Sequence, residues 1–322
     1  MEFLKTYTAA DLLNYFTPRE GETKLGQSVN LALNGFKDSV EKFVLIGIPE
    51  DIGPRANYGK SGAYNAWEAF LTKFLSMQSN STFIGDNVII AGEIKVEDLQ
   101  LQAHDVSISE LKRLVEIIDL RVQTVIEEVL NNGKIPIVIG GGHNNCYPII
   151  NSFENPINVL NIDPHADLRI LEGRHSGNGF SYALANGNLD RYFVLGLHEE
   201  YNSEHIINRF VNEEKLDYLS FNELLESNKK DSEITEIVKN HLKSDAIGLE
   251  IDLDSIKNMP VSAITPVGYT EEEMRKLIIN LSKKFKFHYL HICEGGPTTE
   301  REKTTVGKTI AYLVSDFVKN NQ

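Results

Sequence analysis

The segment NIDPHADLR, residues 161–169, brings two aspartates and a histidine together directly after the apolar run INVL. Asp163, His165 and Asp167 occupy alternate positions of this segment. Side chains alternate along an extended chain, so these three are expected to point the same way. Carboxylates and imidazoles gathered in one place are typical ligands of divalent transition metals. The segment therefore predicts part of a metal site.

Polar clusters follow three other apolar runs in the same manner. His143 ends GGGH after IPIVI, Asp252 and Asp254 form DLD after IGLEI, and Glu294 lies in CEGGP after HYLHI. Ligands of open α/β sheets bind outside the carboxyl ends of strands, so all four clusters are expected at one face. Carboxylates packed together raise one another's pKa and resist burial, a conflict that divalent cations remove.

Two ions that share carboxylates would use both aspartate pairs and both histidines. This carboxylate-rich, thiolate-free set suits Mn²⁺, and Fe, Co, Ni and Zn fit as well. Two metals roughly 3.5–4 Å apart can lower the pKa of a shared water, which is the chemistry of a hydrolase. Cys146 and Cys293 are left out because they lack metal-site spacing and are too few for a disulfide framework.

Each cluster taken alone has a simpler explanation. GGGH can be a tight turn, Asp252 can cap a helix, and Glu294 can be a buried, hydrogen-bonded acid. DPHAD resists this explanation because a cap needs one carboxylate, and four unrelated caps would not be expected to supply ligands for two ions. A dinucleotide site would need G-x-G-x-x-G after the first strand, and GIPEDIGPRANYG lacks it.

Strands and helices that alternate along the chain must position these clusters. Apolar runs predict strands at 43–48, 87–92, 135–140, 157–162, 192–197, 217–221, 246–251 and 288–293. The clearest helix begins at Ser107, where Glu110 would complete a capping box, and an apolar stripe from Ile310 to Phe317 predicts another near the C-terminus. We expect an α/β fold with a parallel sheet between helices, formed by a single domain over 1–322 with 1–40 as a helical extension.

Composition excludes several classes of partner. The net charge of −14 argues against nucleic acid and against an anionic membrane surface. The N-terminus MEFLKTYTAADLL is not a secretory signal, and no run approaches 18 apolar residues. A cytoplasmic protein that acts on a small molecule is the interpretation, and a homo-oligomer is compatible with it.

Taken in order, the motifs from about Ile46 to Pro297 resemble those of the ureohydrolase superfamily, which includes arginase, agmatinase and formimidoylglutamase. The resemblance implies a three-layer αβα sandwich around a central eight-stranded parallel sheet and a centre of two Mn²⁺ ions. It implies one metal bound by His143, Asp163, Asp167 and Asp252. It implies a second metal bound by Asp163, His165, Asp252 and Asp254, so that Asp163 and Asp252 are shared. Glu294 of EGGP would face the amidine or guanidine group.

Several details resemble formimidoylglutamase most. DIGPRANYGKSGA matches the pattern D-x-G-x-x-x-N-x-G-x-x-G-A, GGGH replaces GGDH, HSGNGF resembles S-G-x-P-F, and MPVSAITP resembles A-P-G-V-S-A-P. The position of the proton-shuttling histidine of arginase holds Ser176, with His175 one place earlier. His175 is a candidate general acid, and the alternative is a surface or supporting role. Pro164 and Gly179 depart from the family pattern beside the substrate.

Formimidoylglutamate carries two carboxylates, which planar guanidinium groups bind well. Arg55, Arg169 and Arg174 all fall in loops at the expected site, and at least one should contact substrate; the alternative for each is an ion pair with a neighbouring acid. The resemblance adds Asn57, Ser176 and Asn178 as substrate contacts.

The interpretation is hydrolysis of N-formimidoyl-L-glutamate to L-glutamate and formamide, as in histidine degradation. One alternative is an arginase or another guanidino-acid hydrolase. An alternative of another class is an inactive metal-binding sensor of a ligand.

Overall fold

The computed structural model describes residues 2–33, 35–37, 39–227, 229–243 and 246–321. Its centre is a ten-stranded sheet in the order β1-β4-β3-β5-β10-β9-β6-β7-β8, with β2 paired to β4 at one edge. Nine of these strands run parallel, and β1 pairs antiparallel with β4. Apart from the two-residue β2, eight strands form the parallel body of the sheet. They are β3 (Phe43–Gly47), β4 (Val88–Ile94), β5 (Ile135–Ile139), β6 (Ile157–Ile162), β7 (Leu189–Leu197), β8 (Leu216–Ser220), β9 (Ile247–Asp252) and β10 (Phe287–Cys293).

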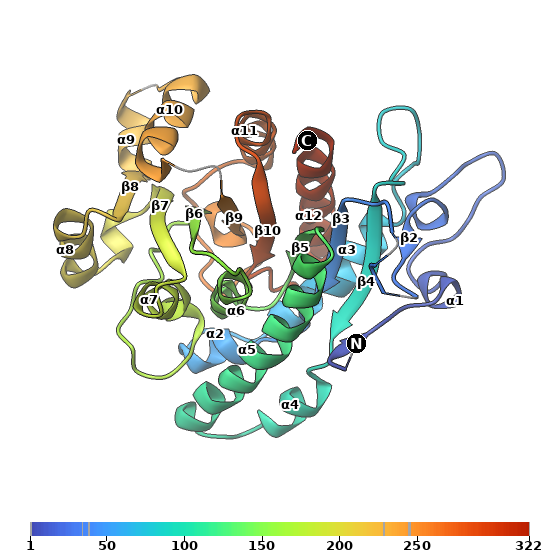
Figure 1. The fold of residues 1–322 in the computed structure, drawn as a ribbon, viewed down its shortest axis with the longest axis horizontal. Helices are drawn as coiled ribbons and strands as arrows, with labels where there is room; N and C mark the ends of the chain where they lie inside the picture. The colour runs from blue at the N-terminus through green and yellow to red at the C-terminus, as the bar shows by residue number, and fades with distance from the viewer. Residues whose placement is uncertain (1, 34, 38, 228, 244–245, 322) are drawn as a thin grey trace.

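Helices cover both faces of this sheet and enclose two apolar cores (Figure 1). One core contains side chains of α3 (Ala66–Phe74), α10 (Asp231–Leu242), α11 (Glu271–Lys284) and α12 (Glu300–Asn320). The other contains those of α2 (Ile52–Ala56), α4 (Glu97–Gln102), α5 (Ile108–Asn131), α6 (Cys146–Asn151), α7 (Gly179–Ala185) and α8 (Glu204–Asn212). The predicted three-layer αβα sandwich with eight parallel strands is confirmed.

The two strongest helix predictions hold. Ser107 is the N-cap of α5 and its side chain accepts from Glu110 N at 3.2 Å, although the Glu110 carboxylate bonds Arg113 and does not complete the capping box. The apolar stripe of α5 is buried, as is the stripe from Ile310 to Phe317 in α12. Of the helices in the described ranges, none is long and apolar enough to cross a membrane.

The expected helical extension at residues 1–40 is wrong. Its described part contains only α1 (Ala9–Leu12) and the 3₁₀ turn η1 (Leu25–Gln27) as helical elements. Two short strands, β1 (Leu4–Lys5) and β2 (Asn30–Leu31), instead pair with β4. Tyr7 donates from its hydroxyl to Glu93 at 2.5 Å and accepts from the Trp67 indole at 2.9 Å. This segment therefore extends the sheet edge.

Candidate metal centre

The four polar clusters follow four strands that are adjacent in the middle of the sheet. His143 follows β5, Asp163 follows β6, Asp252 ends β9 and Glu294 follows β10. These strands lie side by side in the order β5-β10-β9-β6 and run in one direction, so their carboxyl ends meet at one edge. Residues that are more than 100 positions apart in the sequence therefore converge.

The turn after β6 brings Asp163, His165 and Asp167 together in a way that differs from the expected pleat. β6 ends at Ile162, so all three residues lie beyond the strand. Asp163 Oδ1 accepts from the backbone N–H of His165 at 2.6 Å, and Asp167 has a φ of 48°. A tight turn held by Asp163 and a left-handed residue, and not strand alternation, make the side chains converge.

Asp252 and Asp254 follow the same design. Asp252 ends β9, and Asp254 lies in the 3₁₀ turn η6 (Leu253–Ser255). Asp252 Oδ1 accepts from Asp254 N at 2.9 Å, so the capping role considered for Asp252 is present. Its other oxygen, Oδ2, lies 3.2 Å from His143 Nδ1. One carboxylate thus caps its own turn and also joins the polar cluster.

The first ligand set surrounds the Nδ1 atom of His143. Carboxylate oxygens of Asp163 and Asp167 lie 3.1 Å from Nδ1, and the Asp252 oxygen lies at 3.2 Å. All four donor atoms lie within 4.8 Å of one another, a spacing that a single ion could span. This is the set that the sequence predicted for one metal.

The second set is smaller than expected. Asp163, His165 and Asp254 offer donor atoms within 4.8 Å of one another, and His165 Nδ1 lies 3.0 Å from Asp254 Oδ2. Asp163 belongs to both sets, as predicted. Asp252 joins only the first set among the described residues, so its sharing between two ions stays a prediction.

Unsatisfied polar atoms provide an independent test of whether the residues fit metal ions. In the described part of the chain, neither ring nitrogen of the fully buried His143 makes a hydrogen bond, and Asp254 Oδ1 also lacks one. Unpaired buried polar atoms are costly, and a bound cation would give a partner to His143 Nδ1 and to Asp254 Oδ1. Burial, with Asp254 and Asp163 close by, raises the pKa of Asp252 well above its usual value. The donor set therefore fits divalent cations.

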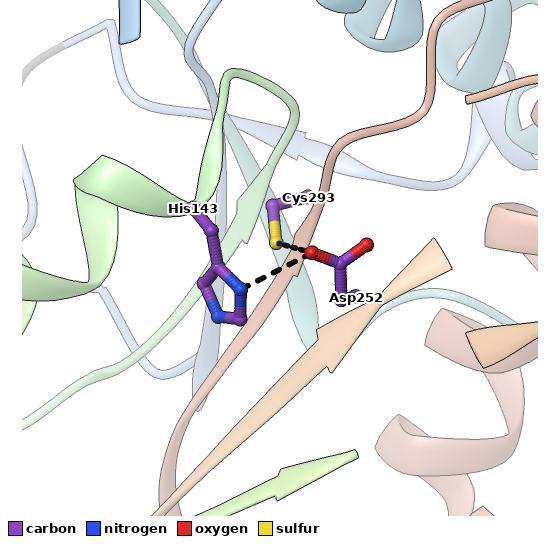
Figure 2. Close-up of side chains that lie close together, drawn as sticks. All are labelled: His143, Asp252 and Cys293. Atoms are coloured by element: carbon purple, nitrogen blue, oxygen red, sulfur yellow. Dashed lines mark hydrogen bonds and ion pairs between the residues drawn. The ribbon is translucent and has the colours of Figure 1, made fainter. Parts of the chain in front are cut away.

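Cys293 lies next to the first ligand set, although its sequence spacing gave no reason to include it. Figure 2 shows the Asp252 carboxylate between the His143 imidazole and the Cys293 thiol. The Sγ atom lies 3.9 Å from Asp252 Oδ2, and the three groups are mutually within 4.8 Å. Both cysteines are free and buried. A thiol therefore lies beside the predicted thiolate-free ligand set.

Glu294 lies in the wall of the centre. Its carboxylate accepts from His143 N at 2.9 Å and is 8% exposed. Burial and the nearby Asp252 raise the pKa of Glu294 well above its usual value. Its φ of 62° is left-handed, and such strain in a non-glycine residue is concentrated at functional sites. One backbone bond fixes this carboxyl group while its edge still reaches the cavity.

A cavity of about 610 Å³ opens above the two ligand sets. His165, Asp167, Asp252, Asp254 and Glu294 line its floor and wall. His143 and Asp163 lie behind them and are fully buried. A small molecule in this cavity would therefore lie against the ligand side chains.

Three of the six predicted substrate contacts also line the cavity. They are Asn57, Arg169 and Ser176, and the Asn57 amide donates to the Ser176 hydroxyl at 3.3 Å. Arg169 is exposed, and its guanidinium has no ion-pair partner among the described residues. The Arg169 side chain packs closely against Gly177, where a Cβ would lie 3.1 Å from Arg169 Cδ. A free guanidinium at the rim can bind an anionic substrate group.

The other three predicted contacts, Arg55, Arg174 and Asn178, lie outside the cavity lining, and their role as substrate contacts stays a prediction. Arg174 is 2% exposed and bonds Asp119 at 2.8 Å, Asn178 Oδ1 at 2.9 Å and Asn144 O at 2.8 Å. The Asn178 side chain is fully buried in the same network. Arg55 bonds the carbonyl of Ala103. The alternative considered for the arginines, an ion pair with a neighbouring acid, is present in both: Arg174 pairs with Asp119, and Arg55 lies 3.5 Å from Asp51.

His175 is also outside the cavity lining, which favours the supporting role considered for it over that of the general acid. It is 1% exposed, its Nδ1 accepts from Gly177 N at 3.1 Å, and its Nε2 lies 3.2 Å from Glu172 Oε1. Burial and the nearby Lys112 lower the pKa of His175 to about 4. A neutral imidazole behind the wall supports the loop that carries Ser176.

Sequence reasoning missed several buried charged groups that support the centre. Glu250 and His291 lie inside β9 and β10 and are fully buried, with His291 Nδ1 2.6 Å from Glu250 Oε2. Glu50 accepts from Gly142 N at 2.7 Å and Gly53 N at 3.0 Å, which ties the GGGH loop to α2. A charged residue within an apolar strand, as in GLEI and YLHI, was the available signal.

This αβα sandwich, with a polar cavity at the ends of its central parallel strands, is an arginase-type architecture. The chain belongs to the arginase family, whose model matches residues 41–318.

Similar proteins agree with this assignment. The formimidoylglutamase of Macrococcus caseolyticus is 25% identical over 292 residues, which covers 86% of this chain and 84% of that protein. That of Streptococcus pyogenes serotype M3 is 25% identical over 300 residues, 87% of this chain and 86% of that protein. The formiminoglutamase of Trypanosoma cruzi, solved with Mn²⁺, has a TM-score of 0.73 at 21% identity and covers 93% of this chain and 98% of its own. Bacillus subtilis formimidoylglutamase has a TM-score of 0.75 at 18% identity, with 95% and 94% covered.

We predict that Arg174→Met lowers stability and leaves substrate binding almost unchanged. The substitution leaves the buried Asp119 without its counter-charge, which costs about 3–5 kcal/mol. Urea unfolding measures the loss, and Arg113→Ala, which removes an exposed pair with Glu110, should change stability little. A normal free energy of unfolding together with a raised KM would contradict the structural role of Arg174.

We predict that His175→Gln keeps the pH–rate profile and lowers kcat by less than tenfold, whereas loss of a general acid costs about 10²–10⁴-fold. A folded-state pKa near 4, below the usual 6.5, means that the neutral ring stabilises the fold above pH 6.5 and that this contribution is lost as pH falls towards 4. Wild type should therefore lose more stability than the variant over that window. A hundredfold fall in kcat with an altered acidic or basic limb would restore His175 as the acid.

Proposed function

We propose that this chain is a two-metal hydrolase that converts N-formimidoyl-L-glutamate and water into L-glutamate and formamide. One observation carries the proposal. Two carboxylate–imidazole sets that share Asp163 lie at the base of a cavity, with Asp163 and His143 behind its lining, and the rim of this cavity holds the unpaired guanidinium of Arg169. The names of the similar proteins support the choice of substrate.

His143, Asp163, Asp167 and Asp252 would hold one Mn²⁺ ion, and Asp163, His165 and Asp254 the other, with Asp252 as a further bridge. When bound, the two metal ions would lower the pKa of a water molecule and so supply the nucleophile at neutral pH. Fe, Co, Ni and Zn suit the same donors.

The chain's own residues orient the amidine for attack at its central carbon. Glu294 would accept hydrogen bonds from the formimidoyl nitrogens, because its oxygen that bonds His143 N is fixed and the carboxyl group borders the cavity. Such charge-assisted bonds strengthen as positive charge develops on nitrogen. Addition of water to the carbon, transfer of a proton to the glutamate nitrogen and cleavage of that carbon–nitrogen bond give formamide and glutamate.

Arg169 would bind a substrate carboxylate at the rim, and Asn57 and Ser176 would hold polar groups beside it. Arg55 and Arg174 lie outside the cavity lining, so the second carboxylate would meet a neutral donor such as the Ser262 hydroxyl of the lining. A single-domain, cytoplasmic enzyme and a homo-oligomer stay predictions of the sequence.

One observation favours a guanidino amino acid as the second candidate substrate. Glu172 lines the cavity together with Arg169. A carboxylate and a guanidinium in one cavity suit a free α-ammonium and α-carboxylate, which arginine has, whereas the amino nitrogen of formimidoylglutamate is substituted. If arginine is the substrate, Glu172→Gln should raise its KM.

The substrate assignment predicts which product appears. Mn²⁺-loaded protein should release formamide and glutamate from formimidoylglutamate and little or no urea from arginine, agmatine or guanidinobutyrate. Separate assays of formamide and urea measure this. Release of urea from arginine would show that a guanidino amino acid is the substrate. Two bound ions without turnover of any substrate would favour the metal-binding sensor.

Arg169→Ala should lower kcat/KM for formimidoylglutamate by about 10- to 100-fold, the range expected for hydrogen bonds to a charged group. The fall should lie mainly in KM because Arg169 is distant from the reacting carbon in this assignment. Arg113→Ala on the exposed face of α5 is the matched control and should keep wild-type kinetics. Unchanged KM in Arg169→Ala would remove this residue from the substrate site.

A further inference from the structure

Three cross-strand pairs of β9 and β10 lead towards His143. Gly248 is in register with Tyr289, Glu250 with His291, and Asp252 with Cys293. Alternate residues of a strand share a face, so each strand presents its three members to the same side of the sheet. The last pair lies at the metal ligands, and the middle pair lies directly behind them.

Glu250 is a fully buried carboxylate with partners on both oxygens. Its Oε1 accepts from the Tyr289 hydroxyl at 2.7 Å, and its Oε2 lies 2.6 Å from His291 Nδ1. The same Oε2 lies 3.5 Å from His143 Nε2. A buried charge persists only when it is paired and hydrogen-bonded, and these contacts meet that condition.

The position of this group is built into the sheet. A Cβ at Gly248 would lie 2.0 Å from the Tyr289 ring, so the ring occupies the space that a side chain would fill. Tyr289 is itself fully buried. The absence of a side chain at Gly248 thus places the hydroxyl that fixes Glu250 Oε1.

The two nitrogens of His143 face different partners as a result. Nδ1 faces the oxygens of Asp163, Asp167 and Asp252, and Nε2 faces Glu250. A proton on Nε2 would lie beside the Glu250 carboxylate, whose Oε2 is 3.5 Å from that nitrogen, and would leave the Nδ1 lone pair available to a cation. Partners of this kind orient metal-ligating histidines and raise their basicity.

We propose that Glu250 is a positioning residue that holds His143 with Nε2 protonated and Nδ1 towards the metal. It thereby sets the affinity of the first ligand set and leaves the second almost unaffected. In the described part of the chain, the side-chain contacts of Glu250 are with Tyr289, His291 and His143, and none is with His165 or Asp254. The inference rests on the metal centre proposed above.

Glu250→Gln keeps the size of the side chain and removes its charge. Co²⁺ or Mn²⁺ is added to the metal-free variant, and binding is measured by calorimetry and by metal analysis after dialysis. The affinity for one of the two ions should fall about 10- to 100-fold. The other ion should keep its affinity within about twofold. Asp254→Asn is the matched comparison, because it removes a donor of the second set and should weaken the other ion.

Proton NMR of the Co²⁺ form identifies the affected ion. Wild type should show paramagnetically shifted, exchangeable N–H signals from its two ligating imidazoles, His143 and His165. Glu250→Gln should shift one of them or exchange it faster, and the other should stay in place. A residue that only supports the fold would not change one signal selectively.

Glu250→Asp separates positioning from charge balance. Asp keeps the charge but withdraws it by one methylene from His143. The ion that binds weakly to Glu250→Gln should therefore also bind weakly to Glu250→Asp, and full recovery of its affinity would overturn the proposal. If neither variant folds, Tyr289→Phe, which removes only the hydroxyl bond to Glu250, should weaken the same ion to a smaller extent, and unchanged affinity would overturn it.

The outcomes keep the two proposals apart. Wild-type protein that binds no ions would reject the metal centre itself. Wild type that binds two ions, with Glu250→Gln weakening neither or both equally, would reject only the role of Glu250.

Discussion

Repulsion among buried carboxylates is the constraint on which the rest of the structure depends. Asp163, Asp167, Asp252, Asp254 and Glu294 gather around two imidazoles with little exposure to water. Burial and mutual repulsion raise the pKa of several of them, to about 6 for Asp254. Such a cluster is stable only if cations or protons compensate it. The arrangement of these side chains suits divalent ions, which would compensate the carboxylate charge.

The parallel sheet makes this concentration of charge possible. Four adjacent strands end at one edge, and each contributes one side of the cluster. Aspartate-held turns then add the ligands that strands alone cannot present. A layer of buried groups lies behind them, with Glu50 under the GGGH loop and the Glu250–His291 pair behind His143. Ligand position is thus determined by strand order first and by hydrogen bonds second.

Much of this could be predicted from the sequence, because apolar runs and the polar residues that follow them are local features. The eight strands of the parallel body and the six candidate ligands, which the structure brings together, came from such patterns. Strand alternation predicted that the side chains of Asp163, His165 and Asp167 converge. They do converge, but through a tight turn, and the sequence did not indicate the left-handed backbone of Asp167. The burial of Arg174 and His175 outside the cavity lining could not be predicted, because a loop sequence does not show whether a side chain faces the cavity or the core. Glu250 was overlooked although a charge inside an apolar strand marked it.

The most direct test of this account is a crystal structure of Mn²⁺-equilibrated protein with an anomalous difference map. The account predicts two peaks per chain, roughly 3.5–4 Å apart. One should lie between His143 Nδ1 and the oxygens of Asp163, Asp167 and Asp252, and the other beside His165 and Asp254. A map without a peak at these residues, from crystals grown in saturating Mn²⁺, would contradict the central claim that the carboxylate cluster exists to bind two cations.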